Sequence, residues 1–408
     1  MATILAYTSP ALGHLLPMSA MLSELAGRGH EVHVRTLSAG IDIGRQLGFS
    51  TEKIDPRIEA MRMDDWKAGN PRAALKRGVA VFGRRAPIEV ADLGDAVGHV
   101  HPDALLIDVN CWGALSAAEA GDIPWATFSP FTPPLRASGV PPFGLGLRPR
   151  AGVIGRMRDA GVRVAVLGPL EKIILPPING IREAVHLSRV ASTDEFLRRT
   201  PLMLLASGKP FQYPQTEWGD PVQMIGPCVA DPVAEPIPDW LRAIDRPIVL
   251  VTTSSEQQDD GGLVETALAA LVDEPVHVVA TMPAGLPTST ASSPNATVRQ
   301  LLPHGAVLDR AVCAVTHGGM GATQKALARG VPVCVVPYGR DQFEVARRVE
   351  VAGCGTRLPA KKLTPPRLLE KVRQAMAMAA GARRVAAGFT EAGGVSRGAD
   401  LFESRVLG

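Results

Sequence analysis

The chain has 408 residues, of which 46% are hydrophobic and 20% are charged. This length and composition suit two ordinary globular domains and exclude an intrinsically disordered chain. Basic residues exceed acidic ones by only 43 − 40 = 3. The net charge therefore predicts no large basic field for nucleic acid or for an anionic membrane.

The five cysteines are widely spaced and show no spacing typical of zinc ligands. We expect buried thiols in a reducing compartment, and hence a cytoplasmic protein. The first residues, MATILAYTSP, lack the pattern of a signal peptide. No apolar run approaches the roughly 18–20 residues of a membrane span, so none is expected.

The first elements alternate in type along the chain. Residues 3–7 form a short apolar run typical of a buried strand, and residues 14–28 have helical apolar spacing. Gly27 and Gly29 predict the helix end, and residues 31–35 predict a second strand. This β-α-β pattern is typical of the start of a parallel sheet.

The rest of the first half continues the pattern until a long Pro/Gly-rich stretch begins at residue 129. A loop of this length inside a domain is usually functional. Around it we predict a helix over 112–120 and strands over 104–108, 123–128, 202–206 and 222–225.

A Pro-rich segment, Asp231 to Pro238, has the composition of a stiff linker, and the α/β pattern then repeats. The second half predicts strands over 247–251, 276–280, 311–316 and 331–336, helices over 263–272 and 322–329, and a helical tail over 379–408. The fold class is thus α/β, with two Rossmann-like doubly wound domains facing a central cleft. Its expected parts are domain 1–222, linker 223–238, domain 239–385 and a C-terminal helix, 386–408, packing back on the first domain.

A glycine-rich turn, Thr316 to Thr323, follows a predicted buried strand and opens a helix. Glycines let the backbone approach a ligand, and free N–H groups at a helix start attract anions. His317 and Thr323 can add donors to a phosphate. The turn matches neither the nucleotide-binding P-loop nor the dinucleotide fingerprint, and a glycine turn that binds nothing is the alternative.

At the end of the next predicted strand, Asp341 and Gln342 offer an acceptor and an amide side by side. This combination suits recognition of neighbouring sugar hydroxyls. Read alone, Asp341 equally suits a helix N-cap.

The block from His317 to Gln342 resembles the donor-binding signature of the family 1 glycosyltransferases of GT-B fold. It is most similar to the bacterial members that decorate macrolides, enediynes and related natural products. Gly13-His14, Phe211-Gln212-Tyr213-Pro214 and Leu302-Pro303-His304 extend the resemblance over nearly the whole chain. It implies an inverting transferase using a dTDP- or UDP-sugar, with no cofactor, acting on a small apolar acceptor as a monomer or homodimer. The implied donor-binding residues are Ser254, Ser255, Leu302, His304, His317, Gly318, Gly319, Thr323, Asp341 and Gln342.

Two departures from the family pattern concern the nucleotide. Where the family often has a Glu that binds both ribose hydroxyls, this chain has Lys325, which favours a dTDP-sugar because deoxyribose lacks one hydroxyl. Where the family stacks the base on an aromatic residue, this chain has Leu301. Base recognition would then depend on backbone near Leu302 and on His304.

The expected catalytic pair is His14 and Asp108. An alcohol needs a base to become a nucleophile, and His, with an ordinary pKa of about 6.5, suits that role. His14 is at the first turn of the first helix, whose N-terminus should keep the ring neutral. Asp108 ends a strand and would orient the ring; a packing histidine and a helix cap are the alternatives.

We expect the acceptor to meet Phe128, Phe131 and Phe143, which could instead seal a core. Metal independence is expected, because no Asp-x-Asp element stands in a loop, and the start of the helix at Gly318 can bear the leaving charge. His99 and His101 lack a third ligand. Alternatives are a C-glycosyltransferase, a nucleotide-sugar epimerase or a non-enzymatic nucleotide-sugar sensor.

Overall fold

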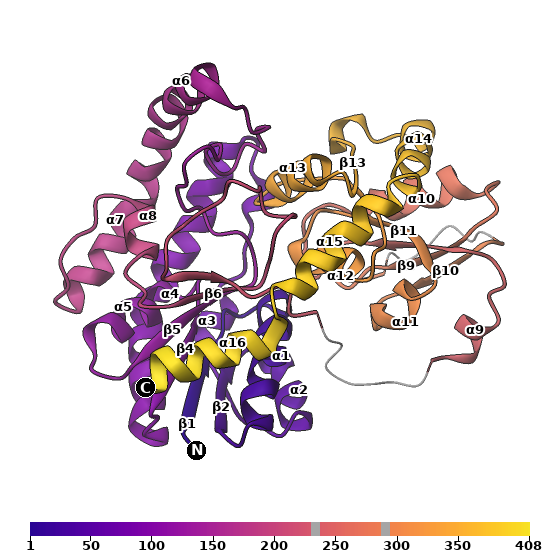
Figure 1. The fold of residues 1–408 in the computed structure, drawn as a ribbon. Helices are drawn as coiled ribbons and strands as arrows, with labels where there is room; N and C mark the ends of the chain where they lie inside the picture. Colours follow the sequence, from indigo (N-terminus) through magenta and orange to yellow (C-terminus); the bar gives the residue numbers. More distant parts are fainter. Residues whose placement is uncertain (230–236, 287–293) are drawn as a thin grey trace.

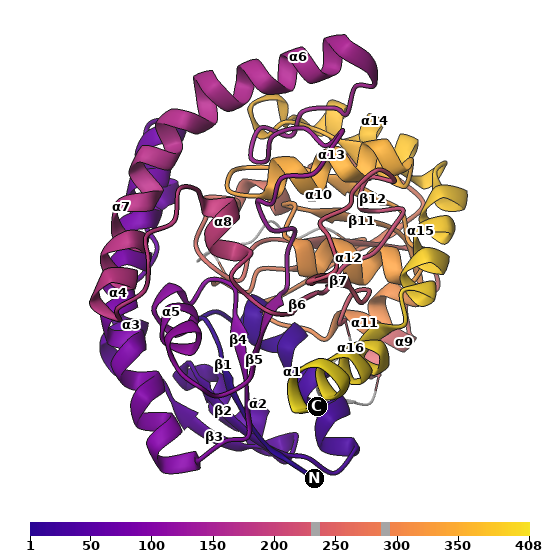
Figure 2. The ribbon, with the colours of Figure 1, turned by 60° about the vertical axis from the view of Figure 1, so that its left-hand side comes forward.

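The computed structural model describes residues 1–229, 237–286 and 294–408. It contains two α/β domains, each built on a parallel sheet (Figures 1 and 2). The strand order is β3-β2-β1-β4-β5-β6-β7 in the first sheet and β10-β9-β8-β11-β12-β13 in the second. Both orders are doubly wound around a central first strand, so the predicted fold class is confirmed.

The first domain places helices on both faces of its sheet. Its strands are β1 (Thr3–Tyr7), β2 (Glu31–Thr36), β3 (Ser50–Lys53), β4 (Ala104–Asp108), β5 (Trp125–Ser129), β6 (Met203–Leu205) and β7 (Val222–Met224). Its helices are α1 (Leu12–Gly27), α2 (Ile41–Gln46), α3 (Pro56–Ala60), α4 (Pro71–Val100), α5 (Trp112–Ala120), α6 (Gly152–Val162), α7 (Gly168–Ala184) and α8 (Thr193–Leu197).

The second domain follows the same plan with six strands. These are β8 (Ile248–Thr252), β9 (His277–Thr281), β10 (Ala296–Arg299), β11 (Ala311–Thr316), β12 (Val333–Val335) and β13 (Gly355–Arg357). The helices are α9 (Asp239–Arg242), α10 (Gly262–Leu271), α11 (His304–Leu308), α12 (Met320–Ala328), α13 (Gln342–Ala352), α14 (Pro365–Met376), α15 (Ala379–Glu391) and α16 (Gly394–Phe402).

The start of the chain shows how the apolar pattern sets the fold. Leu15, Met18, Leu22 and Leu25 recur at helical spacing on α1, and all four are buried against the first sheet. β1 pairs in parallel with β2 and β4, so Leu5 lies between two central strands. This pairing puts the end of β4 beside the first turn of α1.

Several elements escaped prediction because their apolar pattern is weak. β3 has the burial pattern of a mostly exposed edge strand, and β10 is only partly buried. The 30-residue helix α4 buries the charged side chains Arg85, Glu89 and Asp92 among its apolar ones. Buried charges of this kind hide a helical stripe from a pattern based on hydrophobicity.

The expected domain boundaries need two corrections. β7 belongs to the first sheet and reaches Met224, so the first domain does not end at residue 222. Phe389 of α15 packs in the core of the second domain, so the chain does not leave that domain at 386. It turns at Gly393 and Gly394, both with positive φ, and α16 then packs against α1 of the first domain. Residues 230–236 of the expected linker lie outside the described residues.

One helical segment is long and apolar enough to cross a membrane by length and composition alone. It spans Gly152–Ala184, where α6, a π-helical turn (Arg163–Leu167) and α7 run together. The segment reaches this length because Pro176 and Pro177 continue α7 instead of ending it. The second half of α7 packs in the core of the first domain through Ile178 and Ile181.

Candidate functional site

Two side chains that are far apart in the sequence meet where β4 ends beside α1. His14 Nδ1 lies 2.7 Å from Asp108 Oδ2. The Asp108 side chain is fully buried, whereas 16% of the His14 side chain is exposed. The buried carboxylate therefore engages Nδ1 of the ring, so Nε2 is the nitrogen that remains for another partner.

A third polar residue, which the sequence did not single out, completes this cluster. The backbone N–H of Asn110 donates to Asp108 Oδ1 at 2.8 Å. Its side-chain Nδ2 lies 3.4 Å from His14 Nε2. An amide N–H can only donate, so Nε2 is the acceptor and Nδ1 carries the proton that goes to Asp108. The signal was available, since Asn110 is two residues past the strand that ends at Asp108.

The charges around His14 favour its protonated form. Burial is the largest single influence and lowers the pKa of His14, but the charge and hydrogen bond of Asp108, together with the charges of Glu256 and Asp341, outweigh it. The pKa of the ring is therefore raised, which is the opposite of the shift expected from the start of α1.

Asp341, one of the two second-domain acids that raise the pKa of His14, lies close to the glycine turn. Burial raises the pKa of Asp341, and the charges of Arg340 and His14 partly offset the rise. Gln342 follows Asp341 at the start of α13, and a Cβ on Gly318 would lie only 2.9 Å from its Cβ. The catalytic candidates of the first half and the donor candidates of the second thus lie around one region.

The glycine turn has the conformation that its composition predicts. Gly318 has φ +96°, which disfavours any other residue, and its N–H donates to Thr316 Oγ1 at 3.2 Å. A Cβ on Gly319 would lie 2.4 Å from His317 Nε2, so only glycine lets the ring cover the start of α12. Burial lowers the pKa of His317, so the ring is neutral. The Thr323 hydroxyl is fully buried and contacts Thr316 Oγ1 at 3.1 Å, which places it behind the turn.

The loop after β8 turns its polar groups inward. Ser254 N–H donates to Asp260 at 2.6 Å, and Ser254 Oγ accepts from Gln258 Nε2 at 3.0 Å. Gln258 Oε1 in turn accepts from Gln342 Nε2, and Gln342 Oε1 accepts from the N–H groups of Tyr338 and Gly339. Ser255 is exposed. Ser254 and Gln342 therefore form one network that fixes the two loops relative to each other.

Farther along the same domain, His304 Nε2 lies 3.0 Å from Thr281 Oγ1, at the end of β9. Leu302, just before α11, is half-buried, and Leu301 is 73% exposed. These residues lie near the ends of β9 and β10.

An ion pair between the domains was not predicted. Arg340 donates from Nε and Nη2 to both carboxylate oxygens of Asp65 at 2.9 and 2.8 Å, and from Nη1 to Glu256 at 2.6 Å. Asp65 belongs to a short turn of the first domain, Asp65–Lys67, and only 12% of its side chain is exposed. Arg340 directly precedes Asp341, so this ion pair connects the first domain to the loop that carries Asp341.

The three aromatic residues expected at the acceptor differ in position. Phe128 is fully buried in the core between the sheet and α1, so it seals the core and does not line a site. Phe131 meets the His14 ring edge-on, with ring centroids 5.8 Å apart. Phe143 is half-buried in the Pro/Gly loop, next to Gly144 and Gly146, whose N–H groups donate to Glu344 of α13.

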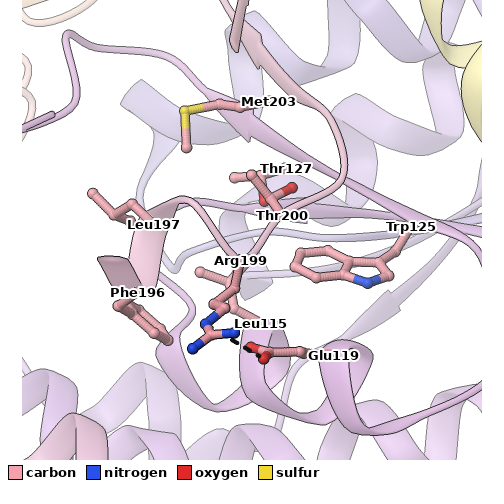
Figure 3. Close-up of a pocket in the computed structure, with 9 residues that line it drawn as sticks. All are labelled: Leu115, Glu119, Trp125, Thr127, Phe196, Leu197, Arg199, Thr200 and Met203. Atoms are coloured by element: carbon pink, nitrogen blue, oxygen red, sulfur yellow. Dashed lines mark hydrogen bonds and ion pairs between the residues drawn. The ribbon is translucent and has the colours of Figure 1, made fainter. Parts of the chain in front are cut away.

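A hollow in the first domain lies away from these residues. Figure 3 shows it between β5, α5, α8 and the residues that follow α8, with Arg199 turned toward Glu119. Neither the His14 cluster nor the glycine turn lines it. Among residues 1–229, 237–286 and 294–408, no group of three or more His, Cys, Asp or Glu side chains is arranged to hold a metal ion.

Comparison with known proteins identifies the family of the chain. Residues 265–392 match the model of the erythromycin biosynthesis protein CIII-like C-terminal domain. The 4'-demethylrebeccamycin synthase of Lentzea aerocolonigenes is 30% identical over 393 residues, covering 91% of each chain. The demethyllactenocin mycarosyltransferase of Streptomyces fradiae is 25% identical and covers 99% of this chain and 86% of its own.

Solved structures of similar fold cover nearly the whole chain. The glycosyltransferase of kitacinnamycin superposes with a TM-score of 0.75 at 23% identity, covering 99% of each chain. The glycosyltransferase VinC in complex with dTDP gives a TM-score of 0.68 at 21% identity, again covering 99% of each. With the 30% identical relative, these similarities show that the chain belongs to the natural-product glycosyltransferases of family 1, with the GT-B fold.

Proposed function

We propose that this glycosyltransferase inverts the anomeric centre while moving a sugar from a dTDP- or UDP-sugar to a hydroxyl of a small apolar acceptor. His14 is the general base and Asp108 orients it. The observation that carries this proposal is the 2.7 Å contact between His14 Nδ1 and Asp108. It holds the ring with Nε2 as its acceptor, in reach of charges from the second domain.

In the proposed step, the acceptor oxygen attacks the anomeric carbon as its proton passes to His14 Nε2. The bond from that carbon to the diphosphate oxygen breaks, and its electron pair stays on the diphosphate. The resulting imidazolium is stabilised by Asp108, as in serine hydrolases. One displacement of this kind inverts the configuration of the sugar carbon.

The leaving diphosphate would lie at the start of α12, where Gly318, Gly319 and His317 form the turn. Helix N-termini attract anions through N–H groups that have no partner within the helix. Because His317 is neutral, it can donate to a phosphate oxygen without a charge of its own. We propose that this end of the helix, and not a bound metal, stabilises the leaving group, so that turnover should persist in EDTA.

The sugar would meet Asp341 and the loop that Ser254 and Ser255 begin. Asp341 lies close enough to His14 for the two charges to influence each other's pKa, as expected if both surround one sugar. The nucleoside would reach Leu302 and His304. The Gln342 side chain would act mainly by fixing the loops, because its amide is engaged with Gln258, Tyr338 and Gly339.

We propose dTDP as the preferred nucleotide. Lys325 stands where the family often has a carboxylate for the ribose hydroxyls, and the structural relative VinC was solved with dTDP. Thermal shifts with dTDP and with UDP test this choice. We expect a larger shift with dTDP, a smaller difference in Lys325→Glu, and no such change in Lys325→Gln; tighter UDP binding by the unmodified enzyme would contradict it.

For the acceptor, Phe131 supplies an apolar ring beside His14, and Phe143 is a second candidate in the Pro/Gly loop. Apolar side chains of this kind suit a polyketide-like or aromatic aglycone. A phenolic acceptor also allows C-glycosylation, since deprotonation of the phenol lets a ring carbon attack. The five cysteines are buried free thiols, which suits a reducing compartment. We therefore place the reaction in the cytoplasm, and we propose that the enzyme acts as a monomer or homodimer.

The proposal is tested by screening dTDP- and UDP-sugars against macrolide and polyphenol acceptors by mass spectrometry. We expect a product heavier than the acceptor by one sugar, formed only when both substrates are present. Incubation with donor alone is the control. An epimerised sugar without acceptor would instead identify an epimerase, and binding without any turnover would identify a sensor.

A further inference from the structure

Helix α6 leaves the body of the first domain and presents an apolar surface to solvent. It stands at the upper edge of both views, far from the C-terminal helix α16 (Figures 1 and 2). Val153, Ile154, Met157 and Val164 are 60%, 64%, 69% and 79% exposed. Large apolar side chains gathered on one surface usually meet another apolar phase.

These side chains point away from the protein. At about 100° per residue, Val153 and Met157 project within about 40° of one another on α6, and the exposed Val164 follows in the π-helical turn. Gly155 and Asp159, which are both buried, lie on the opposite side, toward the domain. The outward face of α6 is therefore its apolar face, the reverse of a normal surface helix.

Arginines lie beside this apolar face. Arg156 is exposed and lies about 100° around the helix from Met157. Arg158 lies about as far on the other side, and its guanidinium donates to Asp159 and to the carbonyl of Arg148. Residues 148–163 contain five arginines and one acid, Asp159, a local charge of 5 − 1 = +4, compared with +3 for the whole chain. The acid is buried and accepts from Arg158 at 2.7 Å, so the exposed charge of the segment is basic.

We propose that α6 binds the surface of an anionic lipid bilayer, with its apolar face in the acyl boundary and its arginines at the headgroups. An apolar stripe bordered by basic residues is the pattern of helices that lie in a membrane interface. Arginines there pair with anionic headgroups while their stems lie along the apolar region. The net charge of the whole chain led us to expect no binding to an anionic membrane, because the acidic residues elsewhere offset the basic charge of this segment.

The contacts of the neighbouring helix favour a helix lying on the membrane over one that spans it. α7 continues from α6, but Ile178 and Ile181 are held in the core of the first domain. Its far end cannot enter a bilayer without unfolding that core. A second copy of the chain fits less well, because a two-fold contact through this face would bring the arginine borders of both copies together.

Sedimentation with lipid vesicles tests the proposal on the full chain without any sugar substrate, so its outcome is separate from that of the proposed chemistry. We expect binding to vesicles with 40% phosphatidylglycerol in phosphatidylcholine, and much weaker binding to pure phosphatidylcholine. Binding should fall with added salt, because headgroup charge is screened.

Two sets of variants separate the apolar and basic contributions. Met157→Ser and Val164→Ser should each weaken binding to the anionic vesicles by about tenfold, since each removes a buried apolar group. Arg150→Gln and Arg156→Gln should each weaken it by about fivefold, the factor that corresponds to ~1 kcal/mol per arginine. Matched controls are Val272→Ser and Arg367→Gln, exposed residues of the second domain, which should leave binding unchanged.

Three results would overturn the proposal. The unmodified enzyme could fail to sediment with anionic vesicles, or the Met157→Ser and Val164→Ser variants could bind them as well as it does. Light scattering could also show a dimer that Met157→Ser dissociates, which would assign the face to a second copy. Because these side chains are exposed, unchanged circular dichroism should accompany every variant.

Discussion

His14 and Asp108 lie 94 residues apart in the chain, yet Nδ1 of the ring and Oδ2 of the carboxylate are 2.7 Å apart. The contact follows from topology, because β1 and β4 are neighbours in a parallel sheet and α1 begins directly after β1. It places a buried carboxylate behind the imidazole, whose other nitrogen, Nε2, is the atom proposed to take the proton of the acceptor.

This contact predicts the pH dependence of the reaction. Asp108 and the acids Glu256 and Asp341 raise the pKa of His14, and only the neutral ring can act as base. We expect kcat/KM to fall as the pH drops through a value above the ordinary 6.5. Asp108→Asn should move this acid limb to lower pH and reduce the maximal rate by about 10²–10⁴-fold.

The matched control for that variant is Asp103→Asn. Asp103 accepts from Thr3 N–H at the opposite end of the same strands, so its loss should leave the profile in place. If the acid limb of the kcat/KM profile does not move in Asp108→Asn, a group other than His14 is responsible for it.

Substitution of Asn110 should move the acid limb of the pH profile to higher pH, opposite to the effect of Asp108→Asn. Its Nδ2 donates to His14 Nε2 and thereby favours the neutral ring, so Asn110→Ala should raise the pKa of His14. The contact is long, so we expect this shift to be small. The titration of the His14 ring by NMR in the free enzyme measures this directly, and a downward shift would contradict the assigned tautomer.

Gly319 should be required for nucleotide binding. A Cβ there would lie 2.4 Å from His317 Nε2, so Gly319→Ala must push the ring off the start of α12. We expect the Kd for dTDP, measured by calorimetry, to rise about tenfold or more. Gly94→Ala in α4, where a Cβ meets open space, is the control for the substitution itself and should bind dTDP normally.

The ion pair between Arg340 and Asp65 should couple the two domains when donor is bound. Asp65→Asn and Arg340→Gln should each raise the KM for the donor, because Arg340 positions the loop that ends in Asp341. The double variant should be less impaired than the sum of the two, with a coupling of about 1 kcal/mol. Additive effects would show that the pair does not form in the working enzyme.

The sequence predicted the parts of the molecule where the apolar pattern is strong. The central strands of both sheets and α1 were located to within a few residues, and the pairing of His14 with Asp108 followed from strand ends that meet at one edge. Edge strands such as β3, and α4 with its buried charges, carry no such pattern. The exposed apolar face of α6 was hidden within a stretch that reads as loop and helix.

Contacts between the domains were beyond the reach of sequence periodicity. Nothing in the spacing of Asp65 and Arg340 indicates that they meet, because their distance depends on how two separate domains dock. Phe128 was wrongly expected at the acceptor, since alternation along a fully buried strand does not tell which face is which. Asn110 could have been found, as it follows the same strand end as Asp108.

The most direct test is acceptor-dependent sugar transfer by His14→Ala, beside His33→Ala as a matched histidine variant. His33 lies on β2 and contacts the exposed Glu31, so its removal should leave kcat/KM unchanged. Loss of the base should lower kcat/KM by about 10²–10⁴-fold while dTDP binding stays the same. Transfer by His14→Ala within tenfold of the unmodified enzyme would contradict the proposed chemistry.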